Sequence, residues 1–314
     1  MRLPKYDELP AAPEGGRSGW GLFGPDDNLG LINLITPERV AAAARLVKRG
    51  ALFPLDAPVN GFTPSIAPGR GPPRHDVLHS AGSIGFDDVY DNFYPQGSSQ
   101  WDALGHVGYS SNTFYNGATE QDVAEGRRNT IDHWARHGIA GRAVLLDMVR
   151  TYAEMGRPYD PGTSTAFSVE DLEAARRRSG VEFQPGDILL IHSGFSAWCL
   201  GLSPEERGRV AAKMQTPGVA NGEEMCRYLW DAHICAIGSD TFAVEVMPPS
   251  FGSVFGFIHR ILIGQFGMAL GELWWTEDLA ADCAADGVYE MFLVSTPING
   301  PGGIGSPANA VAIK

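Results

Sequence analysis

The chain has 314 residues, 44% of them hydrophobic and 19% charged, which is typical of a globular protein and excludes a fibrous or disordered one. Its net charge of −13 argues against nucleic acid or an anionic membrane as the main partner. No stretch approaches the ~20 apolar residues of a membrane span. The four cysteines form no C-x-x-C pair, which indicates reduced thiols and a cytoplasmic protein.

The first residues, 1–19, are rich in Pro and Gly and are expected to form an arm on the surface or on a neighbouring subunit. A single domain is expected over 20–314. Its first helix should begin after Thr36, because Pro37 suits the first helical position, and should end at Gly50. Further helices are predicted at 128–137, 168–180, 204–214, 221–232, 258–271 and 276–283.

Short apolar runs bounded by turn residues lie between these helices and have the length of buried strands. They are Ala143–Met148, Asp187–Ser193, Ile234–Ile237 and Tyr289–Ser295. Leu52–Leu55 is a weaker candidate, since Pro54 restricts it to a sheet edge. Alternating helices and strands predict an α/β protein. Residues 56–125 are rich in Gly, Pro, Asn and Ser, so irregular strands and loops that carry the site are expected there.

One segment of this region gathers polar residues with a regular spacing: Gln96, Gln100, Asp102 and His106. On a continuous strand they would share one face but would spread over ~33 Å, at ~3.3 Å per residue. Ligands of one metal ion lie only ~2–2.2 Å from it, so a shared ion requires the chain to fold back. Spacing alone does not exclude the alternative to a metal site, an ordinary surface loop with two glutamines and a partly buried histidine.

The segment resembles the metal-binding motif of the cyclase family, which includes bacterial kynurenine formamidase and isatin hydrolase. The usual form of that motif is H-x-G-T-H-x-D-x-P-x-H. Here both leading histidines are glutamines, while Asp102 and His106 match. The variant Q-x-x-x-Q-x-D-x-x-x-H is similar to the branch that contains the zinc-dependent trans-dienelactone hydrolase. Further matches are Asp27–Gly30, Asn33–Pro37, Ile131–Ala135, Gly141–Asp147, His259, Glu272 and Gly305–Pro307.

The resemblance implies an α/β, swivelling β/β/α architecture, a twisted sheet or partial barrel flanked by helices, and a homo-oligomer, either a dimer or a tetramer. It implies a divalent metal held by Gln96, Gln100 and Asp102, with zinc expected and manganese as the alternative. His106 would be the general base or a ligand of a second ion. His259 and Glu272 would be catalytic, orienting water, binding that ion or shuttling a proton. From sequence alone the preferred interpretation of these two is a helix-face histidine beside Arg260 and an ordinary solvated carboxylate.

The function expected from this resemblance is metal-dependent opening of a small lactone, similar to a trans-dienelactone, during degradation of aromatic compounds. Hydrolysis of a cyclic or N-formyl amide is the enzymatic alternative. The third hypothesis is a non-catalytic protein that binds a small molecule at a decayed metal site. The absence of a G-x-S-x-G motif argues against a serine hydrolase.

Overall fold

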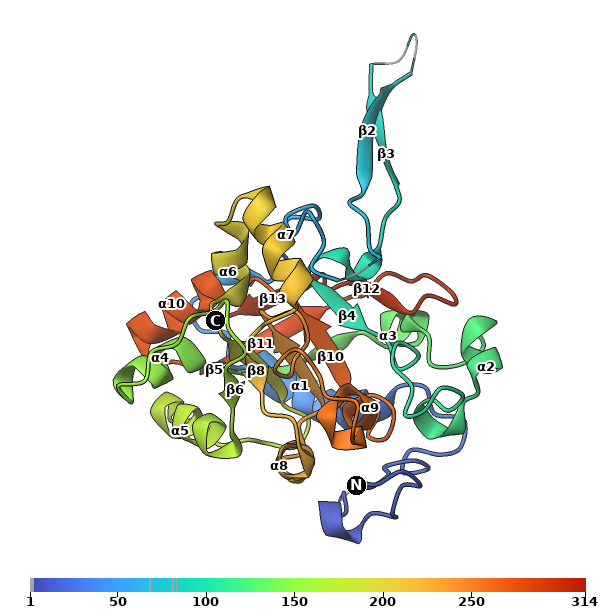
Figure 1. Cartoon of the computed structure of the whole chain (residues 1–314), viewed down its shortest axis with the longest axis vertical. Helices are drawn as coiled ribbons and strands as arrows, with labels where there is room; N and C mark the ends of the chain where they lie inside the picture. Colours follow the sequence, from blue (N-terminus) through green and yellow to red (C-terminus); the bar gives the residue numbers. More distant parts are fainter. Residues whose placement is uncertain (1–2, 68, 81, 83) are drawn as a thin grey trace.

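A curled nine-stranded sheet forms the centre of the protein, and helices flank it (Figure 1). The computed structural model describes residues 3–67, 69–80, 82 and 84–314. The strand order is β1-β13-β11-β5-β7-β9-β10-β4-β12, with parallel pairing from β5 to β10 and antiparallel pairing elsewhere. These strands are β1 (Leu52–Pro54), β4 (Gln100–Asp102), β5 (Ile139–Asp147), β7 (Ile188–His192), β9 (Ala236–Ser239), β10 (Ala269–Glu272), β11 (Glu290–Ser295), β12 (Gly305–Pro307) and β13 (Ala310–Ile313).

The helices vary from one turn to three, and α1 and α5 both pack against β5. They are α1 (Pro37–Ala44), α2 (Glu120–Ala124), α3 (Ile131–His137), α4 (Met148–Glu154), α5 (Val169–Ser179), α6 (Phe195–Leu200), α7 (Pro204–Lys213), α8 (Glu223–Asp231), α9 (His259–Leu262) and α10 (Glu277–Asp286). Shorter 3₁₀ turns cover Tyr6–Glu8, Gly30–Leu34, Pro95–Gly97, Tyr115–Gly117 and Val254–Gly256. Within the described residues, no helix is long and apolar enough to cross a bilayer. The expected α/β class is confirmed.

Local sequence signals explain where the predicted elements begin and end. Ser168 caps α5 through a reciprocal capping box with Asp171, and Gly180 ends the helix in the left-handed conformation. Thr36 caps α1 as expected, although that helix ends at Ala44, before Gly50. β7 is buried along its whole length, and β5 is buried without a break from Ala143 to Asp147, which explains the apolar runs in these two central strands. β1 lies at the edge of the sheet, as Pro54 requires.

The helix predicted over 258–271 is wrong. α9 has only four residues, and the chain then turns and enters the sheet as β10, between β9 and β4. The turn passes through Gly267, which has a φ of +69° and lies against the ring of Tyr115, so a side chain at this position would collide with the ring. Apolar periodicity could not distinguish a buried strand from a buried helix here.

A two-stranded hairpin projects from the body of the molecule (Figure 1). It consists of β2 (Arg74–His79) and β3 (Phe86–Asp91), and every residue of both strands is exposed. The region 56–125 is therefore less irregular than expected, since it also holds β4 and α2. A second small pair joins β6 (Ala166–Phe167) to β8 (Gly218–Val219).

The N-terminal segment lies on α8 of its own chain. The backbone N–H of Tyr6 donates to Asp231 at 2.8 Å, and the indole of Trp230 donates to the carbonyl of Pro4 at 2.9 Å. Tyr6 itself is fully buried against Phe266. Leu3, Tyr6, Leu9 and Ala12 anchor the segment with buried side chains, while Asp7, Glu8 and other residues between them stay exposed.

Candidate metal centre

Strands β4 and β10 bring three polar side chains to one face of the sheet. Gln100 and Asp102 are two residues apart on β4, so they point the same way, and Glu272 lies directly opposite Gln100 on β10. The amide nitrogen of Gln100 donates to Glu272 Oε2 at 2.9 Å and to Asp102 Oδ1 at 3.2 Å. All three side chains are buried. One amide group therefore bridges two carboxylates away from water.

The other face of β4 anchors the strand in the core. Trp101 is fully buried there and donates from its indole to Ser295 Oγ at 2.9 Å. Trp274 packs edge-on against Trp101 and donates to the backbone carbonyl of Gln100 at 2.9 Å. These contacts fix the position of β4, and with it the direction of Gln100 and Asp102.

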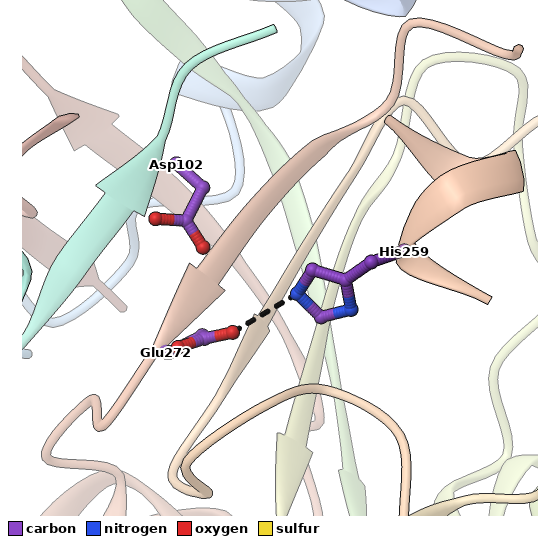
Figure 2. Close-up of side chains that lie close together, drawn as sticks. All are labelled: Asp102, His259 and Glu272. Atoms are coloured by element: carbon purple, nitrogen blue, oxygen red, sulfur yellow. Dashed lines mark hydrogen bonds and ion pairs between the residues drawn. The ribbon is translucent and has the colours of Figure 1, made fainter. Parts of the chain in front are cut away.

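His259, at the start of α9, completes the cluster (Figure 2). Its Nε2 lies 3.0 Å from Glu272 Oε1, and one ligand atom each from Asp102, His259 and Glu272 lie within 4.8 Å of one another. Two buried oxygens here, Gln100 Oε1 and Asp102 Oδ2, have no hydrogen-bond partner among the described residues. Buried polar atoms are normally paired. These two oxygens, together with the carboxylate of Glu272 and the imidazole of His259, fit a divalent cation.

The charges of the cluster shift its protonation equilibria. Burial, together with the neighbouring charge of Glu272, raises the pKa of Asp102 to about 6. Burial alone would lower the pKa of His259, but the carboxylates of Glu245 and Glu272 outweigh burial and raise it well above its ordinary value. For Glu272 burial raises the pKa, yet the hydrogen bond with His259 lowers it overall. Without an ion, a protonated imidazole therefore balances the carboxylates.

His106 and Gln96 lie together at the solvent side of the cluster. After β4 the chain turns at Leu104 and Gly105, where the backbone passes so close to Val123 that a larger residue would not fit. The turn brings His106 Nε2 to 3.6 Å from Asp102 Oδ1, and the imidazole is 24% exposed. Gln96 Nε2 lies 3.5 Å from His106 Nδ1. The chain thus folds back as a shared site requires.

The structure gathers all six expected site residues, but it distributes them differently from the expectation. Gln100 and Asp102 belong to the buried cluster, whereas the side-chain amide of Gln96 lies next to His106. His259 and Glu272, expected to be catalytic, themselves offer ligand atoms. The geometry therefore favours a ligand set in which the last two residues accompany Asp102.

Two nearby residues were not foreseen from the sequence. Glu245 is fully buried, with Oε2 2.5 Å from His259 Nδ1. Its signal in the sequence was a single carboxylate between Val244 and Val246 in an apolar stretch. Arg70, at the base of the hairpin, donates to the backbone carbonyl of Gln96 at 2.5 Å. Its charge partly opposes the rise in the pKa of Asp102 and contributes to the lowered pKa of Glu272. Nothing in the local sequence pointed to Arg70.

Comparison with known proteins agrees with the motif. The sequence model of the Cyclase family matches residues 54–246, more than half of the chain. A solved structure described as a novel cyclase is 32% identical, with a TM-score of 0.84 over 95% of this chain and 99% of that one. The chain belongs to the cyclase family. A search of curated protein sequences gave no match.

Two isatin hydrolases share the fold of this cyclase-family chain at lower identity. Isatin hydrolase A from Ralstonia solanacearum is 15% identical, with a TM-score of 0.61 over 88% of this chain and 97% of its own. An isatin hydrolase bound to the product analogue thioisatinate is 14% identical, with a TM-score of 0.60 over 86% of this chain and 93% of its own. The curled sheet with flanking helices is thus the fold that the sequence resemblance implied.

Proposed function

We propose that this chain is a metal-dependent hydrolase that opens a small cyclic ester, with a lactone as substrate. The observation that carries the proposal is the buried cluster of Asp102, His259 and Glu272, in which Asp102 Oδ2 and the adjacent Gln100 Oε1 have no hydrogen-bond partner among the described residues. Buried polar atoms are normally paired, because each unpaired group costs ~1–3 kcal/mol unless a water or an ion satisfies it. Two carboxylates and an imidazole make a cation the better occupant.

The donor set suits a borderline ion. Carboxylate and amide oxygens favour manganese or magnesium, and the imidazole of His259 favours zinc. We therefore propose zinc, with manganese as the alternative. Such an ion polarises a carbonyl group and lowers the pKa of water toward ~7. Asp102, His259 and Glu272 would hold it. Gln100 would add its side-chain carbonyl oxygen as a further ligand, while its amide nitrogen continues to donate to Glu272.

His106 is the residue best placed to move a proton. Its imidazole is 24% exposed, whereas Asp102, His259 and Glu272 are buried. A substrate entering from solvent would therefore meet His106 before the ligands. We propose that His106 accepts the proton of the attacking water and that Gln96, next to Nδ1, orients the ring.

A cyclic amide is the second candidate substrate, and the shared fold with two isatin hydrolases favours it. Lactone and amide hydrolysis differ in the leaving group. An amide nitrogen must be protonated as the C–N bond breaks, whereas the oxygen of an activated lactone leaves more readily as an anion. Amide hydrolysis would therefore depend more strongly on a proton donor such as His106.

Parallel assays of lactones, cyclic amides and N-formyl amides would test the proposal. The protein would be stripped with a chelator and then reconstituted with Zn²⁺ or Mn²⁺. We expect turnover only after reconstitution, faster for lactones, and His106→Ala to reduce amide turnover more than lactone turnover. Equal or faster amide turnover would reject the lactone preference. No stoichiometric metal and no turnover would favour a non-catalytic binding protein with a decayed site.

The remaining expectations concern the surroundings of the enzyme. We propose a homo-oligomer, either a dimer or a tetramer, and a cytoplasmic location in a cell that degrades aromatic compounds. Light scattering of the purified protein and fractionation of the source cell would check the two points.

A further inference from the structure

We propose that Glu245 is a positioning residue that fixes the imidazole of His259 so that Nε2 faces the metal centre. This inference rests on the proposed metal dependence, but it does not depend on which substrate is hydrolysed. It concerns a residue that lies outside the group of potential ligand atoms formed by Asp102, His259 and Glu272.

Both oxygens of Glu245 contact the same residue. Oε2 lies 2.5 Å from His259 Nδ1, and Oε1 accepts from the backbone N–H of His259 at 3.2 Å. One contact holds the ring and the other holds the backbone at the start of α9. Together they determine the direction in which the side chain leaves the helix. On its far side, Nε2 is 3.0 Å from Glu272.

The ring is also held across its face. Phe257 stacks on the imidazole with the ring centroids 5.0 Å apart and the planes 4° from parallel. Two edge contacts and one face contact leave the ring little freedom to rotate. A preoriented ligand binds an ion without the entropy loss of ordering the side chain.

Glu245 is itself rigidly held. Its backbone lies beside Val219, and the N–H of Val246 donates to the carbonyl of Val219 at 2.9 Å. Gly218 comes so close to the backbone of Glu245 that a Cβ would lie 2.4 Å from the carbonyl carbon. The side chain is fully buried. A buried charge is costly unless it is paired, and His259 is the partner that the described contacts give it.

The chemistry of metal-bound histidine explains why a carboxylate belongs here. A histidine ligand usually donates its second ring N–H to a carboxylate or carbonyl, which fixes the tautomer and makes the ligating nitrogen more basic. A proton on Nδ1, held by Glu245, leaves the lone pair of Nε2 for an ion. The other buried histidine, His192, differs, because its nearest carboxylate oxygens are 3.7 Å away. Direct carboxylate contact is therefore not a general feature of buried histidines in this fold.

Metal affinity measured without substrate tests the proposal. Zn²⁺ would be titrated into the chelator-treated full chain in competition with a chromogenic chelator. Glu245→Ala should weaken zinc binding ~10–100-fold, the usual effect of removing such a partner. Glu245→Gln should have a smaller effect, because its carbonyl oxygen can still accept one of the two contacts. It should not restore wild-type affinity, because that one oxygen cannot serve both the ring and the backbone N–H. If the alanine variant does not fold, the glutamine variant decides the question.

Asp187→Asn is the matched control. Asp187 is also a buried carboxylate, but it pairs with Arg142 at 2.6 Å, outside the metal centre. This variant should unfold more easily than the wild type and still bind zinc with unchanged affinity. Unchanged zinc affinity in Glu245→Gln, or an equal loss in Asp187→Asn, would overturn the positioning role.

Proton NMR of the zinc-loaded protein gives a readout that a merely structural role would not move. A hydrogen-bonded imidazole N–H that exchanges slowly with water should give a low-field signal. The signal should disappear in His259→Asn, shift in Glu245→Gln and remain in Asp187→Asn. Its persistence unchanged in Glu245→Gln would overturn the proposal. Absence of turnover with normal zinc binding in the wild type would instead count only against the proposed function.

Discussion

Gln100 and Glu272 face each other across the antiparallel pair β4–β10, and the amide of Gln100 donates to Glu272 Oε2 at 2.9 Å. The same nitrogen also donates to Asp102. Its two hydrogen bonds thus offset the electrostatic repulsion between the two buried carboxylates. In the metal-free protein it partly does what a cation would do.

Gln100→Glu should therefore destabilise the metal-free protein, because it places a third carboxylate next to those of Asp102 and Glu272 and removes the amide that donates to both. We expect a loss of about 1–3 kcal/mol in the free energy of unfolding. A divalent ion should restore more stability to this variant than to the wild type. Urea unfolding with and without Zn²⁺ would measure both effects. Gln121→Glu is the control, since Gln121 donates to Glu125 on an exposed helix and its change should cost only about 0.2–0.5 kcal/mol.

Asp102→Ala should abolish tight metal binding while the fold survives. Asp102 is fully buried and its pKa is raised to about 6, so its charge is not stabilised by the metal-free structure. Elemental analysis would show loss of metal, and thermal unfolding of the metal-free variant and the metal-free wild type would show no loss of stability. Asp147→Ala should behave in the opposite way. It removes the N-cap of α4, costs about 0.5–2 kcal/mol and keeps the metal. Full occupancy in Asp102→Ala would mean that the site is misplaced.

His106→Ala distinguishes a base from a ligand. If His106 is the base, the variant should keep wild-type metal stoichiometry and lose about 10²–10⁴-fold in kcat. Steady-state kinetics and metal analysis on the same preparation would measure both quantities. Loss of metal, with activity partly restored by excess ion, would instead make His106 a ligand.

Metal affinity should fall as the pH is lowered. The folded, metal-free protein holds protons more tightly than an unfolded chain does, because the pKa of Asp102 is raised to about 6 and that of His259 is raised well above its usual value. An ion must displace these protons, so its binding is opposed below those pKa values and favoured above them. Chelator competition at a series of pH values would show the trend. An affinity independent of pH between about 5 and 8 would contradict this protonation scheme.

Gly271→Ala should destabilise the protein and disturb the metal centre. A Cβ at Gly271 would lie 2.7 Å from the indole of Trp274, the ring that donates to the backbone carbonyl of Gln100. Overpacking of this kind costs about 1–3 kcal/mol. Gly97→Ala is a suitable control, because the nearest atom would be Tyr94 Cβ at an ordinary 3.7 Å. Denaturant unfolding and zinc affinity should both change in the first variant and remain close to wild type in the second.

The sequence was sufficient for much of the fold because its signals were local. The caps of α1 and α5 and the apolar runs of β5 and β7 needed no information from distant residues. The segment before Glu272 was different. Its apolar residues fit either a helix or a strand, and only pairing with β4 and β9 decides between them.

The candidate site was predictable where the family motif was present. Asp102, His106, His259 and Glu272 were expected from the resemblance, and the structure brings them together. Glu245 was missed because its role depends on a contact with a residue fourteen positions away, which no local pattern reveals. Which of these residues are potential ligands also could not be read from the sequence, because it depends on which atoms the tertiary fold brings together and leaves unpaired.

The potential ligands come from β4, α9 and β10. These elements are far apart in the sequence and meet only after the strands of the sheet have paired. An unfolded or half-folded chain therefore has no comparable binding site. An ion would act as a ligand of the native state alone, and free metal at one hundred times its dissociation constant would add about 2.7 kcal/mol to the free energy of unfolding. Cellular metal supply would then govern how long the folded protein persists, in addition to any effect on catalysis.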